Sequence, residues 1–170
     1  LLPSAIEDPD PVLLIENLPT YYTPMSFELP DSSHRVPLGK AAIQREGSDI
    51  TVVTYARMAN ETRVAAAEAG QAGISVEVVD LRTMAPRDRE TVLASVRKTG
   101  RLLVVHEAVR EHGVGAEIAP VVSEELFGEL KMPVRRLGGT YSPVPYSKPL
   151  EDAYAPNAAR ILESITQCVN

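Results

Sequence analysis

Short apolar runs alternate with amphipathic stretches along most of this chain, and the alternation predicts an α/β fold. Several runs are apolar on both faces, as expected of strands buried between two layers of helices. They are Ile50–Tyr55, Val76–Leu81, Leu102–His106 and Val134–Leu137. Apolar residues recur at helical spacing in Asn60–Ala72, Asp88–Lys98, Gly115–Leu126 and Asn157–Gln167. Strands and helices in this order predict a mostly parallel sheet with helices on both faces.

Capping residues mark several of the predicted helix ends. Asn60 is suited to an N-cap, and Gly73 is suited to the left-handed position just after a helix. Pro86-Arg87-Asp88 predicts the start of the next helix, and Pro156 precedes the last one.

The first forty residues follow a different pattern. Leu2–Ile6 is typical of a helix end, Asp8–Pro11 of a turn, and Val12–Ile15 of a buried strand. Asn17–Gly39 contains Pro19, Pro24, Pro30 and Pro37, which forbid a central strand or a long helix. We therefore expect an extended linker before the α/β repeat.

Composition limits the possible partners and compartments. A chain of 170 residues with 44% hydrophobic content can bury the core of one domain with a small appendage. Its net charge of -6 has the wrong sign for a general nucleic-acid or anionic-membrane binder, so we expect neither partner. The apolar runs are far shorter than a membrane span, and the first residues lack the pattern of a signal peptide. The single cysteine, Cys168, excludes an intrachain disulfide and fits a reducing compartment.

Histidines supply the first candidate chemistry. His106 and Glu107 end a predicted parallel strand, where open α/β sheets place ligand-contacting groups, so acid/base or hydrogen-bonding roles are conceivable. A packed, hydrogen-bonded interface or a loop anchor is the commoner role of such residues, and we favour it. His112 is expected to face solvent or a subunit contact, and His34 lies in the linker with no orienting partner.

The segment Gly113-Val114-Gly115 could present backbone N–H groups to an anion at a helix N-terminus. It lacks both the full dinucleotide fingerprint and a Walker lysine, which favours a tight turn and close helix packing instead. Asp80 and Arg82 at the end of the second strand are expected to be structural. Arg135 and Arg136 alternate faces on a strand and cannot form one continuous basic patch.

Several blocks of sequence, in order and spacing, resemble one enzyme family. The blocks are Gly47–Val53, Val76–Asp88, Ser95–Arg101, His106–Ala108, Pro143–Tyr146 and Leu150–Asp152. Together they are similar to the beta subunit of the thiamine-diphosphate-dependent 2-oxo acid dehydrogenases, the decarboxylating component of the pyruvate and branched-chain complexes. The resemblance covers nearly the whole chain.

The resemblance implies a domain organisation. Residues 1–16 would end a pyrimidine-binding domain, residues 17–40 would form the interdomain linker, and residues 41–170 would form a transketolase-type C-terminal domain. Thiamine diphosphate and magnesium would belong to the whole enzyme, because the family's cofactor-activating glutamate and active-site histidine have no counterpart here. The resemblance therefore assigns no catalytic or cofactor-binding residue to this chain.

The same resemblance implies an assembly role in a heterotetramer, with this portion inactive alone. Expected partners are the alpha subunit, a second beta subunit and the lipoyl-bearing acyltransferase core. The enzyme would be cytoplasmic if bacterial and would lie in the mitochondrial matrix if eukaryotic.

One ion site is implied residue by residue. The family's potassium site is made partly from backbone carbonyls at positions that match Ala5, Asp8 and Asp10, in a turn that Pro9 and Pro11 would fix. The alternative is a plain turn, since the site's other carbonyls would come from the family's N-terminal half. Some relatives carry an acidic residue where this chain has Lys131-Met132-Pro133-Val134. A basic group there would repel the arginines of an acyltransferase binding domain, so docking residues stay unassigned.

Two other functions compete with this one. The chain could be the C-terminal domain of another transketolase-type enzyme, such as a deoxyxylulose-phosphate synthase, although Leu81-Arg82-Thr83 argues mildly against it. It could instead be a free-standing flavodoxin-like module that binds a nucleotide or an anion at the Gly113 turn.

Overall fold

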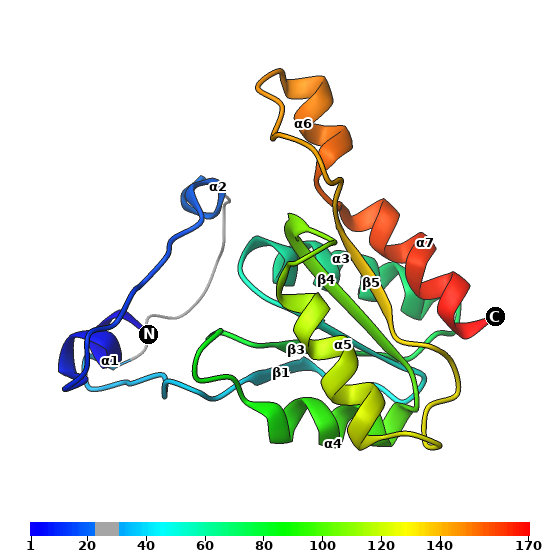
Figure 1. The fold of residues 1–170 in the computed structure, drawn as a ribbon, viewed down its shortest axis with the longest axis horizontal. Helices are drawn as coiled ribbons and strands as arrows, with labels where there is room; N and C mark the ends of the chain where they lie inside the picture. The colour runs from blue at the N-terminus through cyan, green and yellow to red at the C-terminus, as the bar shows by residue number, and fades with distance from the viewer. Residues whose placement is uncertain (23–30) are drawn as a thin grey trace.

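A central five-stranded sheet organises the molecule (Figure 1). The computed structural model describes residues 1–22 and 31–170. The strand order is β1-β3-β2-β4-β5. The strands are β1 (Ala42–Arg45), β2 (Ile50–Thr54), β3 (Val76–Asp80), β4 (Leu102–Val109) and β5 (Arg135–Gly139). All neighbouring pairs are parallel except β1 with β3, so the predicted mostly parallel sheet is confirmed.

Helices cover both faces of the sheet. Helices α3 (Arg57–Gln71) and α7 (Ala158–Val169) pack on one face, and α4 (Arg89–Thr99) and α5 (Val114–Glu125) cover the other. Successive strand residues point to opposite faces, so each joins a different layer of the core. This double burial explains why the strands are apolar without alternation.

Two capping predictions are confirmed and one is wrong. The Asp88 carboxylate accepts a hydrogen bond from the Thr91 amide at 3.1 Å, and Gly73 follows α3 with a φ of 83°. Asn60 is not the N-cap of α3, because the helix already begins at Arg57. Met58, fully buried in the core, extends the helix by packing against the sheet.

The predicted buried strand at Val12–Ile15 is wrong. These residues form no strand, and Leu13 and Ile15 are 85% and 83% exposed. No described strand pairs with them, and an unpaired apolar run cannot bury its backbone polar groups.

Three short elements lie outside the predicted set. They are the edge strand β1, helix α2 (Leu18–Tyr21) within the predicted linker, and helix α6 (Lys148–Tyr154). Helix α1 (Leu2–Glu7) matches the predicted helix end. No helix in residues 1–22 and 31–170 combines the length and apolar character that a bilayer crossing requires.

The N-terminal segment extends away from the sheet and returns to it through a few hydrogen bonds (Figure 1). The Ala41 amide donates to the Asp88 carboxylate at 3.1 Å, and the Gly39 amide donates to the Thr83 hydroxyl at 3.1 Å. The predicted domain boundaries after residues 16 and 40 stay a prediction.

Candidate functional site

The residues with strained backbone conformations lie at the carboxyl edge of the sheet. In the described ranges, the non-glycine residues with positive φ are Ala56, Arg82 and His112, at 51°, 58° and 63°. Each lies in the loop that follows one of the parallel strands β2, β3 and β4. Such strain is found preferentially at functional sites and at contacts that the fold must hold in place.

His106 is the buried polar residue at this edge. Its ring is fully buried, lies 6.3 Å from the ring of Tyr55, and brings Nδ1 within 2.9 Å of the Ala108 carbonyl oxygen. Since a carbonyl only accepts, Nδ1 carries the proton in this contact and Nε2 is an acceptor. Nε2 is buried and has no hydrogen-bond partner in the part of the chain that the structure describes. Burial lowers the pKa of His106, and the charge of Arg136 acts in the same direction.

Three glycines enclose this imidazole. A Cβ atom added at Gly113 or Gly115 would lie 2.7 Å from a ring atom of His106, and one at Gly138 would lie 2.9 Å away. Any side chain there would overlap the ring, and Nε2 is already shut off from solvent. The geometry supports close helix packing as the role of the glycine pair, with His106 as a packed, hydrogen-bonded residue.

Glu107 points to the other face of the sheet. Its carboxylate pairs with the Arg57 guanidinium at 3.2 Å and accepts a hydrogen bond from the Asn17 side-chain amide at 2.7 Å. Because adjacent strand residues face opposite ways, His106 and Glu107 cannot act together as an acid/base pair. Glu107 instead anchors the N-terminal segment to the carboxyl edge.

The remaining candidates around this edge have structural surroundings. Burial raises the pKa of Asp80, whose carboxylate accepts hydrogen bonds from the Arg82 amide at 3.0 Å and from Gln44 at 3.3 Å. His112 is exposed, as predicted, and lies edge-on to Tyr141. His34 is exposed in the N-terminal segment.

The predicted ion site lies at the end of α1. Ala5 belongs to that helix, and the Asp8 carboxylate after it accepts a hydrogen bond from the Asp10 amide at 3.0 Å. Ala5 and Asp8 are half-buried and Asp10 is exposed. Potassium binding by the three backbone carbonyls stays a prediction.

In the described ranges, no group of three or more His, Cys, Asp or Glu side chains is placed to hold a metal ion.

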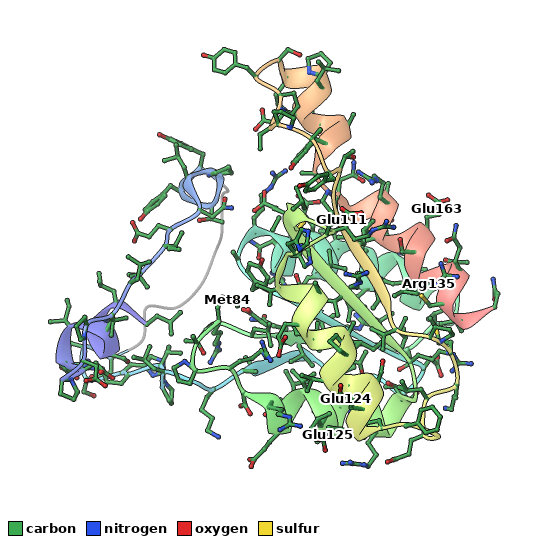
Figure 2. All side chains as sticks on the ribbon, viewed as in Figure 1. Met84, Glu111, Glu124, Glu125, Arg135 and Glu163 are labelled. Atoms are coloured by element: carbon green, nitrogen blue, oxygen red, sulfur yellow. The ribbon has the colours of Figure 1, made fainter. Side chains whose placement is uncertain are left out.

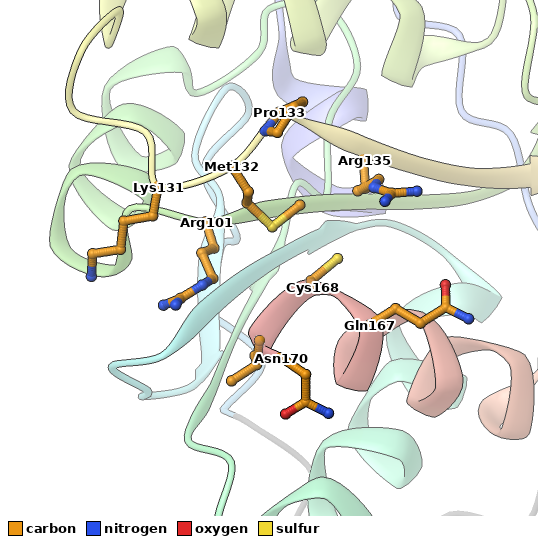
Figure 3. Close-up of a pocket in the computed structure, with 9 residues that line it drawn as sticks. Arg101, Lys131, Met132, Pro133, Arg135, Gln167, Cys168 and Asn170 are labelled. Carbon is orange, nitrogen blue, oxygen red and sulfur yellow. The ribbon is translucent and has the colours of Figure 1, made fainter.

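Sequence reasoning missed two polar features. Glu77 is a fully buried carboxylate in β3 that contacts Lys98 and Ser95, and a charge within an apolar strand was the available signal. A polar pocket lies at the amino edge of the sheet, between β4, β5 and the end of α7 (Figure 3). Its residues are far apart in the sequence, and no local pattern joins them.

This sheet, with its two helix layers and crowded carboxyl edge, defines an α/β domain of a recognised kind. The family described as "Transketolase, C-terminal domain" matches residues 39–161. The chain belongs to that family.

Longer proteins match this chain over nearly its whole length. It is 46% identical to the mitochondrial pyruvate dehydrogenase E1 component subunit beta of Pisum sativum, over 96% of this chain and 46% of that protein. It is 42% identical to the acetoin:2,6-dichlorophenolindophenol oxidoreductase subunit beta of Cupriavidus necator, over 95% of this chain and 47% of that protein. The chain thus spans about half the length of these relatives.

A solved structure shares the architecture. It is a split gene transketolase in an inactive beta4 tetramer, with a TM-score of 0.70 and 27% identity over 84% of this chain and 45% of that one.

Proposed function

We propose that this chain is the C-terminal part of the beta subunit of a pyruvate-type 2-oxo acid dehydrogenase decarboxylating component. The observation that carries the proposal is the 46% identity to a pyruvate dehydrogenase beta subunit over 96% of the chain. Pyruvate is favoured over a branched-chain 2-oxo acid, and the similar acetoin oxidoreductase subunit supplies the competing substrate.

The role of this part would be assembly. Large apolar side chains are exposed on the N-terminal segment and on the segment after β5, both of which meet the carboxyl edge. They are Leu13, Ile15, Leu18, Tyr21, Tyr22, Tyr141, Val144, Tyr146 and Leu150. Apolar side chains that gather on an exposed segment are typical of protein interfaces. We assign these segments to contacts with the alpha subunit, a second beta subunit and the preceding domain, in a heterotetramer that serves a lipoyl-bearing acyltransferase core.

Residues 1–16 would complete a pyrimidine-binding domain, residues 17–40 would link it, and residues 41–170 would be the transketolase-type domain. Thiamine diphosphate and magnesium would bind outside this chain, and potassium would bind the carbonyls of Ala5, Asp8 and Asp10. The compartment would be the cytoplasm in a bacterium and the mitochondrial matrix in a eukaryote.

The test uses the polypeptide that contains this sequence, co-expressed with the alpha subunit from the same source. Reduction of an artificial electron acceptor is measured with pyruvate, a branched-chain 2-oxo acid and acetoin, with thiamine diphosphate and magnesium present. We expect the highest kcat/KM with pyruvate, and none when the alpha subunit is omitted. A higher kcat/KM with acetoin would indicate an acetoin oxidoreductase subunit instead. Activity without an alpha subunit would refute the proposal.

A potassium arm tests the ion site separately. Thermal stability of the same complex is compared in potassium and sodium chloride at equal ionic strength. Potassium is expected to raise the unfolding temperature, since an ion that binds only the folded state stabilises it. Equal unfolding temperatures in the two salts would refute the potassium site and leave the proposed substrate unaffected.

A further inference from the structure

The pocket at the amino edge of the sheet is separate from the carboxyl edge described above. Figure 2 shows Arg135 beside α7, away from Glu111 at the other end of the sheet. The pocket has a volume of about 230 Å³. It is lined by Arg101, Lys131, Met132, Pro133, Arg135, Gln167, Cys168, Val169 and Asn170.

Three cations line this basic pocket, and none of them has an acidic partner among the described residues. Arg101 donates to the Asp49 carbonyl oxygen at 3.2 Å, and Lys131 donates to the Thr99 carbonyl oxygen at 2.9 Å. Arg135 makes no side-chain hydrogen bond or ion pair with any residue in 1–22 and 31–170. On the neighbouring surface, by contrast, Arg97 pairs with Glu129 at 3.2 Å.

Two of the three cations, Arg101 and Arg135, act on the Cys168 thiol. Burial raises the pKa of the Cys168 thiol, while the charges of Arg135 and Arg101 oppose that rise. Arg101 and Arg135 line the same pocket as Cys168, and their charges favour negative charge beside the thiol. Figure 3 shows Arg101 and Arg135 on either side of this cysteine.

The volume limits what can enter. About 230 Å³ equals roughly eight water molecules at ~30 Å³ each. A phosphate ion or a small polycarboxylate fits with part of its hydration shell, whereas drug-sized ligands occupy pockets of roughly 300–1,000 Å³. Arginine guanidinium groups match the oxygen geometry of both anions.

We propose that the basic pocket formed by Arg101, Lys131 and Arg135 binds a small oxyanion of the phosphate or carboxylate class. The site is independent of the proposed enzyme function, because it lies at the opposite edge of the sheet. It does not use the glycine pair at the start of α5.

The test is equilibrium dialysis of radiolabelled inorganic phosphate against the full polypeptide that contains this sequence, in its assembled complex. Arg135→Gln is the main variant, because the Arg135 side chain holds no other residue in place. Loss of one charge-assisted hydrogen-bonding group is expected to weaken phosphate binding about tenfold. Arg63→Gln is the matched control, since Arg63 is an exposed arginine on α3 outside the pocket. It should leave phosphate affinity unchanged.

A second variant and a competitor complete the design. Lys131→Gln should weaken phosphate binding in the same direction, which guards against a local defect of the Arg135 variant. Citrate that displaces labelled phosphate from the wild type, and does so less well from Arg135→Gln, would extend the site to carboxylates. Failure of citrate to compete would restrict it to phosphate. Wild-type phosphate affinity in both pocket variants, or an equal loss in Arg63→Gln, would overturn the proposal.

Discussion

Gly115→Ala tests the packing of the carboxyl edge most directly. A Cβ atom at this position would lie 2.7 Å from Nε2 and 3.2 Å from Cδ2 of His106, and 3.2 Å from Cγ1 of Val104. Gly113 and Gly138 lie against the other side of the imidazole, since a Cβ atom added at either would lie 2.7 or 2.9 Å from Cε1. The new methyl group must therefore displace either α5 or the end of β4.

Two opposing terms set the size of the effect. Overpacking of a close-packed core costs about 1–3 kcal/mol. Alanine offsets this by up to about 1 kcal/mol through its higher helix propensity, and by less in the first turn, where Gly115 lies. We expect a net destabilisation of about 1–2 kcal/mol, which raises the local opening equilibrium roughly tenfold.

Hydrogen exchange of the amides in β4 and α5 measures this opening without requiring global unfolding. Gly70→Ala is the matched control, since its Cβ would meet only the flexible end of Arg45, at 3.0 Å. The control should be neutral or slightly stabilising. His106→Ala combined with Gly115→Ala should recover part of the loss relative to the sum of the single changes. Protection in Gly115→Ala equal to that of the wild type would refute the crowding argument.

Other contacts give further predictions. Asp88→Ala removes the cap of α4 and the acceptor of the Ala41 amide, and should lower the free energy of unfolding by about 1–2 kcal/mol in urea denaturation. Burial lowers the pKa of His106 in the folded protein, so the unfolded chain binds more protons as the pH falls below about 6.5. Stability should therefore be retained above that pH and decline below it, and this part of the decline should be absent in His106→Asn; matching pH–stability curves would contradict the argument. Lys98→Met leaves the fully buried Glu77 carboxylate without its cation and should cost about 3–5 kcal/mol. Glu77→Gln leaves a lysine that is 43% exposed and reaches water, and should cost about 1–3 kcal/mol. A lower denaturation midpoint for Glu77→Gln than for Lys98→Met would contradict this reasoning.

The sequence predicted those strands whose apolar residues also have neighbouring strands to pair with. Ile50–Thr54 and Val12–Ile15 are both apolar runs, yet only the first forms a strand. The difference is that β2 lies between β3 and β4, while the other run has no neighbour among the described strands. Strand β1 has neighbours but was not predicted, because an edge strand with mostly exposed residues carries no apolar pattern. Propensity alone does not report tertiary partners.

The site shows the same limit. His106 and the glycine pair lie within ten residues, so their proximity could be predicted from the sequence. Gly138 completes the enclosure only because β5 pairs with β4 in parallel. The basic pocket depends still more on topology, since Arg101, Lys131 and Gln167 meet only where two strands begin and the last helix returns to them.

The contrast between the two edges bears on how the domain is used. Open parallel sheets offer their carboxyl edge to ligands, because helix N-termini and loop residues converge there. In this chain, glycine-packed His106 fills that edge on one face, and Glu107 holds the N-terminal segment on the other. The segments that leave the edge carry exposed apolar side chains. These exposed segments at the carboxyl edge support the assembly role proposed above.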